Sequence, residues 1–379
     1  MTDRAAVSAL ERAILNYRKE LLRNDANALK AILDVYQPVR VRLIARVAAL
    51  ETALADAGTL STADVLRLDR AKELLAQTDD ELRRLMPRVE GIVGQYRQVA
   101  VNLAVDHAQG LTLITAATDG TDTLARVRAT WTRLNTGAAE QIAGRLQQGS
   151  PLRTLLDNIE GGAGRSIADA LRESVALGRN PRATAAILER VLDVPAARLL
   201  LIARTEQLNS YRGATVATYQ ENADILEGFV WTCSRSSRTC LTCLSMDGAI
   251  YPLDSTFNKQ HPACRCSYRP KLIGVNDDGM VPTGREWFYS QTKADQLKML
   301  PQSARDEFAA GKLDLADFVK VDENRDWGQS HRVGGVGYAR DQAKQRREAG
   351  TTLPKPRAAR RTRAADDDGD LVTVRERAA

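Results

Sequence analysis

The sequence predicts a mainly α-helical protein: a long N-terminal helical bundle or coiled-coil arm, then a small α+β domain rich in cysteine and histidine, then a disordered C-terminal tail. Three observations support this fold class. Aromatic residues make up only 5% of the chain while alanine, leucine and arginine abound, which favours helices over sandwiches and barrels. Apolar residues recur every three or four positions near the N-terminus. All five cysteines fall within residues 233–266.

The length of 379 residues predicts two or three domains at about 150 residues each. Changes in composition and in the period of apolar residues divide the chain into four regions. We expect a helical arm or bundle at 1–180, a core domain with the Cys/His-rich module at 181–275, a C-terminal helical segment at 276–333, and a disordered charged tail at 334–379.

The composition is that of a folded, water-soluble protein. It is 44% hydrophobic and 27% charged, with a mean hydropathy of -0.33. No apolar run approaches the roughly 20 residues that cross a bilayer, and the first fifteen residues contain two acids and lack the apolar core of a secretory signal. We therefore expect neither a membrane span nor secretion, and a reducing compartment.

The first helices carry one narrow apolar stripe each. Their apolar residues lie three and four positions apart. They are Val7, Leu10, Ile14, Tyr17 and Leu21, and, after Pro38, Leu43, Val47, Leu50 and Leu54. Gly58 predicts a stop, and the pair Ser61 and Asp64 resembles a capping box that opens a third helix. An antiparallel bundle and a coiled-coil arm that docks on an assembly both fit this spacing.

The middle of the chain predicts weaker helices. Glycines between Gly91 and Gly178 suggest short helical pieces and turns. Asn180 followed by Pro181 is a strong helix start, because asparagine caps and proline at the first position gives up only an orphan donor. Pro195 is expected to end that helix, and a longer one should follow to about residue 222. A short strand is expected at 229–232, and helix again from 285 to 318.

The cysteines and one histidine have the spacing of a zinc site. Cys240-x2-Cys243 precedes His261-x2-Cys264-x-Cys266, so two short chelating pairs are separated by a loop of seventeen residues. Cys240, Cys243, His261 and Cys264 are the best four ligands, and Cys266 competes for the fourth place. Four protein ligands leave no position for a reacting water, so the metal would be structural.

Other interpretations of the cysteines stay open. Disulfides would require an oxidising compartment, and free buried thiols can serve as small hydrophobic side chains. Catalysis has little support, because the sequence contains no phosphate loop, no GxSxG elbow and no HExxH pair. His107, on a predicted helix among apolar residues, is expected to be packed or at the surface. We therefore expect a protein that is not an enzyme.

The net charge of +6 is concentrated near the C-terminus. Residues 340–363 carry a net charge of +7, residues 364–379 carry -3, and the rest of the chain carries +2. The basic stretch either contacts DNA phosphates or keeps the chain soluble and pairs with its acidic end. The candidate DNA contacts are Lys355, Arg357, Arg360, Arg361 and Arg363.

Several motifs resemble, in order, the core of the Mu F-like head morphogenesis proteins of tailed bacteriophages. They span about 190–270, roughly a fifth of the chain. They are Arg204-Thr205-Glu206, Trp231, the run from Arg238 to Cys243, Asp247-Gly248, and the run from His261 through Arg265 to Cys266. Relatives commonly place an acidic residue where this chain has Ser236, so any bracing by that acid must come from elsewhere. Arg204 and Glu206 are expected to be ion-pair partners or surface residues.

The resemblance implies a minor head protein that acts with the portal and the capsid or scaffold proteins during procapsid assembly. It further implies a place inside the virion head near the portal, reached from the host cytoplasm, and in some members an association with packaged DNA. The alternative is a zinc-containing nucleic-acid-binding protein with a helical oligomerisation arm, in which the cysteine segment itself binds DNA.

Overall fold

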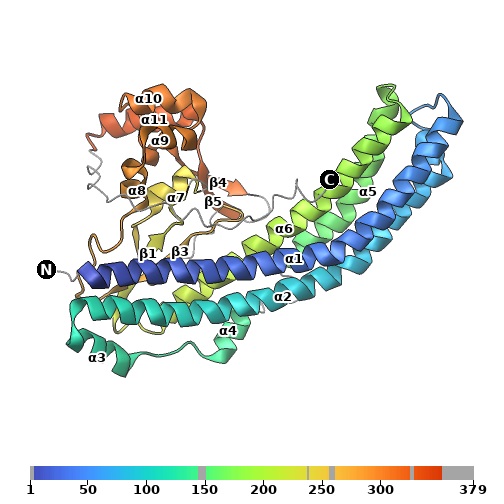
Figure 1. Ribbon diagram of the computed structural model, residues 1–379. Coiled ribbons are helices and arrows are strands. Elements are labelled where there is room, and N and C mark those ends of the chain that lie inside the picture. Colours follow the sequence, from blue (N-terminus) through green and yellow to red (C-terminus); the bar gives the residue numbers. More distant parts are fainter. Residues whose placement is uncertain (1–3, 144–150, 237–238, 256–260, 325–327, 352–379) are drawn as a thin grey trace.

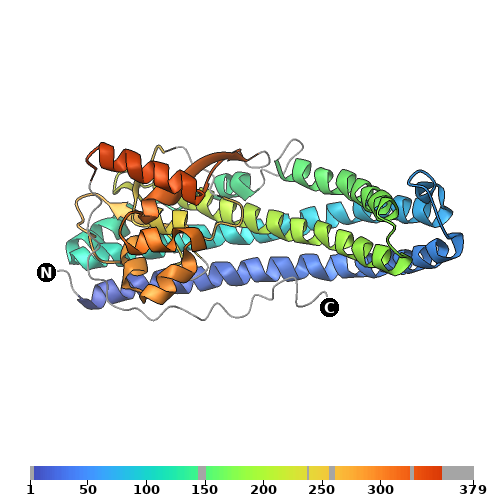
Figure 2. The same ribbon diagram turned by 90° about the horizontal axis from the view of Figure 1, so that it is seen from above.

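The computed structural model describes residues 4–143, 151–236, 239–255, 261–324 and 328–351. A long, curved helical arm carries a smaller globular end on one side, close to the N-terminus (Figures 1 and 2). The predicted fold class is confirmed: the protein is mainly α-helical, begins with long helices and places its small sheets in the C-terminal half. Within the described residues, no helix is both long enough and apolar enough to cross a membrane.

Four helices build the arm. They are α1 (Arg4–Ala57), α2 (Asp69–Asp119), α5 (Pro151–Ala176) and α6 (Pro181–Gln220). Helices α1 and α2 form one antiparallel hairpin, α5 and α6 form another, and the two hairpins share a continuous apolar core. The arm is therefore an antiparallel bundle, and α6 extends from its far tip to a position beneath the globular end (Figure 1).

The predicted apolar stripe of α1 is what holds this bundle together. Every member from Leu43 to Leu54 is buried, as are Leu10, Ile14 and Leu21. Burying a leucine side chain contributes roughly 1.5–3 kcal/mol, so the stripe is one large contribution to the apolar core that all four helices share. Gly58 follows the last residue of α1, as predicted, and has a positive φ of 67°.

The helix breaks expected at prolines and glycines were wrong. Helix α1 continues through Pro38, α6 continues through Pro195, and α2 continues through Gly91 and Gly110. The predicted loose region from Gly91 to Gly178 is mostly two long helices, with α3 (Thr121–Thr130) and α4 (Thr136–Ala143) between them. Local propensity fails here because side-chain burial along the whole bundle outweighs the cost of each breaker.

The start of α2 also differs from the prediction. The Asp64 amide does donate to the Ser61 hydroxyl oxygen at 3.1 Å. That bond closes a turn before the short 3-10 helix η1 (Val65–Arg67), and α2 begins only at Asp69. The pair therefore caps the connection between two helices and not the long helix itself.

The globular end is built on a three-stranded antiparallel sheet in the order β2-β1-β3. Its strands are β1 (Leu226–Thr232), which includes the strand predicted at 229–232, β2 (Ile250–Pro252) and β3 (Ser267–Leu272). Helix α7 (Leu241–Met246) lies between β1 and β2 in the chain. The apolar core of the globular end is a separate cluster from the core of the arm, and it includes the buried cysteines.

Short helices and a hairpin complete this end. The predicted helical stretch 285–318 consists of α8 (Gly284–Ser290), α9 (Lys293–Met299), η2 (Gln302–Ala304), α10 (Arg305–Ala309) and η3 (Leu315–Phe318). The hairpin of β4 (Val319–Asn324) and β5 (Gly328–Val333) was not predicted, and it packs against α7.

The region expected to be a disordered tail from residue 334 needs a correction. Helix α11 occupies Val336–Glu348. Composition alone suggested no structure there, but Ala339 and Ala343 are buried and the Arg346 guanidinium forms two 2.9 Å bonds with the Asp317 carboxylate. Residues 352–379, with all five candidate DNA-contact residues, lie outside the described residues, so DNA contact by them stays a prediction.

We predict that Asn180→Ala lowers the free energy of unfolding by about 1 kcal/mol, because the Asn180 side chain accepts the Ala183 amide at 2.8 Å and caps α6. Urea denaturation of the whole protein measures the change. Asn180→Asp keeps an acceptor at the cap and should unfold at nearly the same concentration as the native chain. An equal loss of unfolding free energy in both variants would show that the cap does not stabilise the helix.

Candidate metal centre

Four side chains predicted as ligands lie in one continuous cluster. The His261 Nε2 atom lies 3.4 Å from the Cys240 Sγ and 3.3 Å from the Cys243 Sγ, and the Sγ atoms of Cys243 and Cys264 are 3.7 Å apart. A tetrahedral zinc ion with ordinary bond lengths places sulfur atoms about 3.8 Å apart and sulfur and nitrogen about 3.6 Å apart. The donor types and these three distances suit a tetrahedral metal ion, with Cys240, Cys243 and His261 forming one close group and Cys264 adjoining it through Cys243.

Local structure explains how these side chains meet. Cys240 is the N-cap of α7, where its sulfur accepts the Cys243 amide at 3.4 Å, so one turn of helix holds both thiols of the CxxC pair on the same side. The second pair sits on a tight turn in which the Cys264 amide donates to the His261 carbonyl at 3.1 Å. Ala263, in the middle of that turn, has a positive φ of 59°.

The competitor Cys266 is also close. The Sγ atoms of Cys243, Cys264 and Cys266 all lie within 4.8 Å of one another, forming a second possible set that shares Cys243 with the set of Cys240, Cys243 and His261. All three are buried. Cys233, the remaining cysteine, belongs to neither set among the described residues, although it is buried in the same core.

Electrostatics divide the thiols of the cluster into two kinds: the pKa of Cys240 and Cys264 is lowered, whereas hydrogen bonding to Cys240 raises the pKa of Cys243 and burial raises that of Cys266. Hydrogen bonding to Cys243 and to His261 lowers the pKa of Cys240 to about 5. Burial acts to lower the pKa of His261, but its hydrogen bonds to the thiols of Cys240 and Cys264 outweigh burial and raise it to about 11. Burial likewise acts to raise the pKa of Cys264, and its hydrogen bonds with Cys243 and His261 bring that pKa well below its usual value.

Asp247 braces the loop that leads into the site. Its carboxylate accepts the Cys233 amide at 2.9 Å and the Arg235 Nε at 2.7 Å, and the aspartate is buried. The Arg18 guanidinium of α1 donates to the Cys233 carbonyl at 2.7 Å. Position 236 carries no acid, and bracing comes instead from Asp247 and from the Thr239 hydroxyl, which accepts the Ser236 amide at 3.1 Å.

Helix α6 anchors the second pair of ligands. The buried Arg212 side chain donates to the carbonyl oxygens of Cys264 at 2.7 Å and Cys266 at 3.0 Å. The Thr205 hydroxyl, two turns earlier on α6, accepts the Ala263 amide at 3.0 Å. Three hydrogen bonds thus tie the His261–Cys266 loop to a helix that continues into the arm, and the Arg212 charge lies beside the thiols.

The structure places the remaining predicted residues around this core. Arg204 donates to Asp25 of α1 at 2.8 Å, and Glu206 lies 3.9 Å from the Arg97 guanidinium of α2, so both join helices of the arm. Trp231 is buried in the sheet, with its ring 5.1 Å from that of Tyr268. Arg238 lies outside the described residues.

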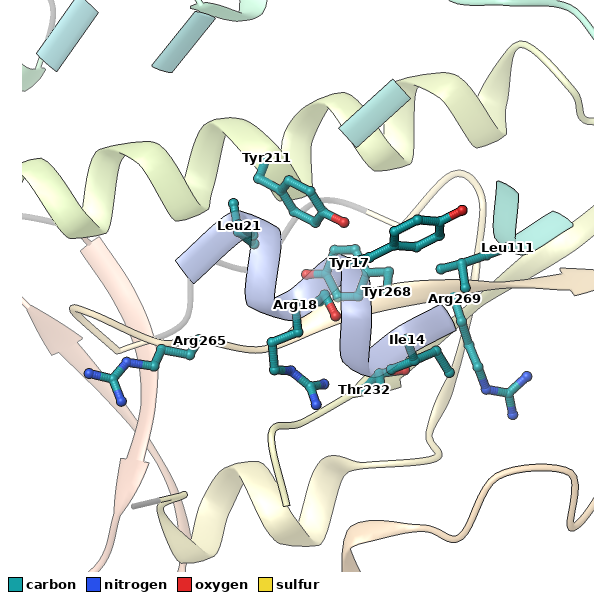
Figure 3. Close-up of a pocket in the computed structure, with 11 residues that line it drawn as sticks. Ile14, Tyr17, Arg18, Leu21, Leu111, Tyr211, Thr232, Arg265, Tyr268 and Arg269 are labelled. Carbon is teal, nitrogen blue, oxygen red and sulfur yellow. The ribbon is translucent and has the colours of Figure 1, made fainter. Parts of the chain in front are cut away.

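Arg265 lines a small pocket where α1, α2, α6 and the sheet meet (Figure 3). The guanidinium groups of Arg18, Arg265 and Arg269 point in different directions in Figure 3 and do not converge on one ligand. The pocket has room for about one water molecule, which is too little for a substrate.

Two residues that anchor the His261–Cys266 loop were not predicted from the sequence. Arg212 was not singled out, and Thr205 was noted only as part of a motif. A signal existed for Arg212, since it is a charged residue on a helix whose neighbours along the sequence are mostly apolar, small or uncharged. A buried arginine needs several acceptors, and here they are main-chain carbonyls that no sequence pattern reveals.

Comparison with known families agrees with this geometry. Residues 165–269 match the model of the family described as Phage Mu protein F like protein. This segment is Mu F-like. The resemblance is thereby confirmed, and the Mu F-like segment begins inside α5, about 25 residues before the span of 190–270 that the motifs suggested. No curated protein and no solved structure matches the chain.

The Mu F-like segment covers slightly more than a quarter of the chain. It includes all of α6, β1, α7 and β2, the turn that carries His261 and Cys264, and the first half of β3. The helix and the cysteine cluster it anchors therefore belong to one unit of the family model.

We predict that Arg212→Ala lowers the free energy of unfolding by about 3 kcal/mol, because two buried carbonyl groups lose a charged donor. Arg182→Ala removes an exposed arginine from the same helix and should change it by less than about 0.5 kcal/mol. Chemical denaturation of both variants measures the difference. Similar values for the two would contradict an anchoring role for Arg212.

Proposed function

We propose that this chain is a minor head protein of a tailed bacteriophage that associates with the portal during procapsid assembly. The observation that carries the proposal is the match of residues 165–269 to the Mu F-like family, which is typically structural. The role is non-catalytic, and the partners are the portal and the capsid or scaffold proteins. The chain would reside in the head near the portal.

The shape of the molecule supports an interaction role. The bundle of α1, α2, α5 and α6 extends well beyond the globular end, so its far part contacts little of the rest of the chain (Figures 1 and 2). A projecting arm of this kind can reach a neighbouring subunit while the globular end is held elsewhere.

We further propose that Cys240, Cys243, His261 and Cys264 hold one structural zinc ion. The ion would neutralise the buried thiolates and supply folding free energy to a small domain. Arg212 would offset the remaining negative charge of three thiolates around a divalent ion. The support is the donor set and its spacing, together with the closed shell that four protein ligands make.

The zinc proposal predicts about one zinc per chain in protein purified without chelators, measured by elemental analysis. Cys240→Ser with Cys243→Ser should lose the metal and unfold at lower denaturant concentration, because two ligands are removed. Cys233→Ser changes a buried cysteine outside both candidate sets and should keep the metal. Cys266→Ser should keep it too. Metal-free protein that is fully folded would refute the proposal.

The portal proposal predicts that this chain is present in procapsids of its phage at a few copies per portal ring. Quantitative mass spectrometry of purified particles, normalised to the portal subunit, measures that ratio. A ratio set by the major capsid protein would contradict portal association. Absence from procapsids would favour the alternative, a zinc-containing nucleic-acid-binding protein with a helical oligomerisation arm.

A further inference from the structure

The arm is bent, and the bend lies beyond the globular end. Figure 1 shows α1 and α2 running straight past the sheet and then turning together, with α1 and α2 on the outer side of the curve. Sharp turns in helices have identifiable causes, of which proline is the commonest. Three of the four arm helices contain an internal proline: Pro38 in α1, Pro87 in α2 and Pro195 in α6.

The prolines of α1 and α2 lie at nearly the same level. The Arg42 guanidinium forms two bonds with the Glu81 carboxylate, at 2.5 and 2.6 Å, so these residues are opposite each other in the antiparallel pair. Moving six residues back along α1 and six residues forward along α2 from this pair places Pro87 opposite Tyr36. Pro38 is only two residues from that level, an axial offset of about 3 Å.

The proline of α6 lies at that level too. Arg40 donates to the Asp193 carboxylate at 2.6 Å across the antiparallel α1 and α6 pair. Moving two residues back along α1 and two residues forward along α6 from this pair places Pro195 opposite Pro38. All three prolines therefore lie within one turn of the bundle.

Each proline weakens its helix in the same way. Its ring has no N–H for the carbonyl four residues earlier and pushes that carbonyl away, so the helix bends. The carbonyls concerned are those of Asp34, Arg83 and Val191. Kinks at different levels would cancel one another or twist the bundle, whereas kinks at one level allow the three helices to bend together.

Contacts at this level hold the bend in place. The Tyr36 hydroxyl donates to the Leu192 carbonyl, next to the carbonyl that Pro195 leaves without its usual donor, and Tyr36 is fully buried. The ion pair of Arg40 with Asp193 links α1 to α6, and that of Arg42 with Glu81 links α1 to α2. The apolar core continues through the bend without interruption.

We propose that Pro38, Pro87 and Pro195 form a fixed elbow that sets the angle between the far part of the arm and the globular end. The elbow gives the arm a defined direction before any partner binds. Surfaces on the two sides of it are thereby presented to a partner at one angle, and a straight arm would present them at another.

The test uses the full chain with Pro38→Ala, Pro87→Ala and Pro195→Ala combined. Nineteen residues of α1 lie beyond Pro38 and reach about 28 Å, so removing a kink of about 20° displaces the tip by roughly 10 Å. Spin labels on non-natural residues at positions 177 and 273, at the arm tip and the globular end, report this distance by pulsed electron resonance. Both positions are exposed.

We expect one narrow distance in the native chain and a distance longer by up to about 10 Å in the triple variant. Pro181→Ala is the matched control, because that proline lies at the first position of α6 and should leave the distance unchanged. Alanine favours helix, so the triple variant should fold, and circular dichroism checks this. An unchanged distance in the folded triple variant would overturn the elbow, and a broad distribution in the native chain would overturn its rigidity.

Discussion

The attachment of the His261–Cys266 loop to helix α6 is the constraint on which the rest of the structure depends. Arg212 holds the carbonyls on both sides of Arg265, and Thr205 holds the amide before Cys264. These bonds fix the second pair of candidate ligands relative to the first, which α7 presents. Because the same helix belongs to the core of the arm, the geometry of the cysteine cluster and the position of the arm are set together.

This shared helix gives the Mu F-like segment a physical meaning. The match includes the whole of α6 and the cluster, and leaves out α1, α2 and the helices after β3. Helix α1 is attached to it through the ion pair of Arg204 with Asp25 and the contact of Arg18 with Cys233, and α2 through Arg97 beside Glu206. His107 of α2 also joins this junction, packed between the Tyr211 hydroxyl at 3.0 Å and Glu20 at 3.1 Å. A junction held by this many contacts is consistent with the proposed interaction role.

Sequence reasoning succeeded where a local rule decides the structure. Asn180 and Pro181 start α6 because a cap and a fixed φ act within one turn, and the stripe of α1 is buried because its period matches the helix. It failed where distant packing overrides a local rule, as at Pro38, Gly91 and Pro195. The spacing of the cysteines and His261 was enough to find the cluster. The anchoring by Arg212 could not be found, since its partners are main-chain atoms more than fifty residues away. Helix α11 was missed because its burial rests on two alanines and on ion pairs to other elements.

The most direct test of this account is the zinc-edge X-ray absorption spectrum of the purified full chain. We expect a four-coordinate zinc ion with three sulfur ligands near 2.3 Å and one nitrogen near 2.0 Å, as Cys240, Cys243, Cys264 and His261 would supply. A shell of four sulfurs would put Cys266 in place of His261 and change the assignment of the loop. A shell of oxygen and nitrogen, with no sulfur, would contradict the account, because the metal would then lie away from the cluster that α6 anchors.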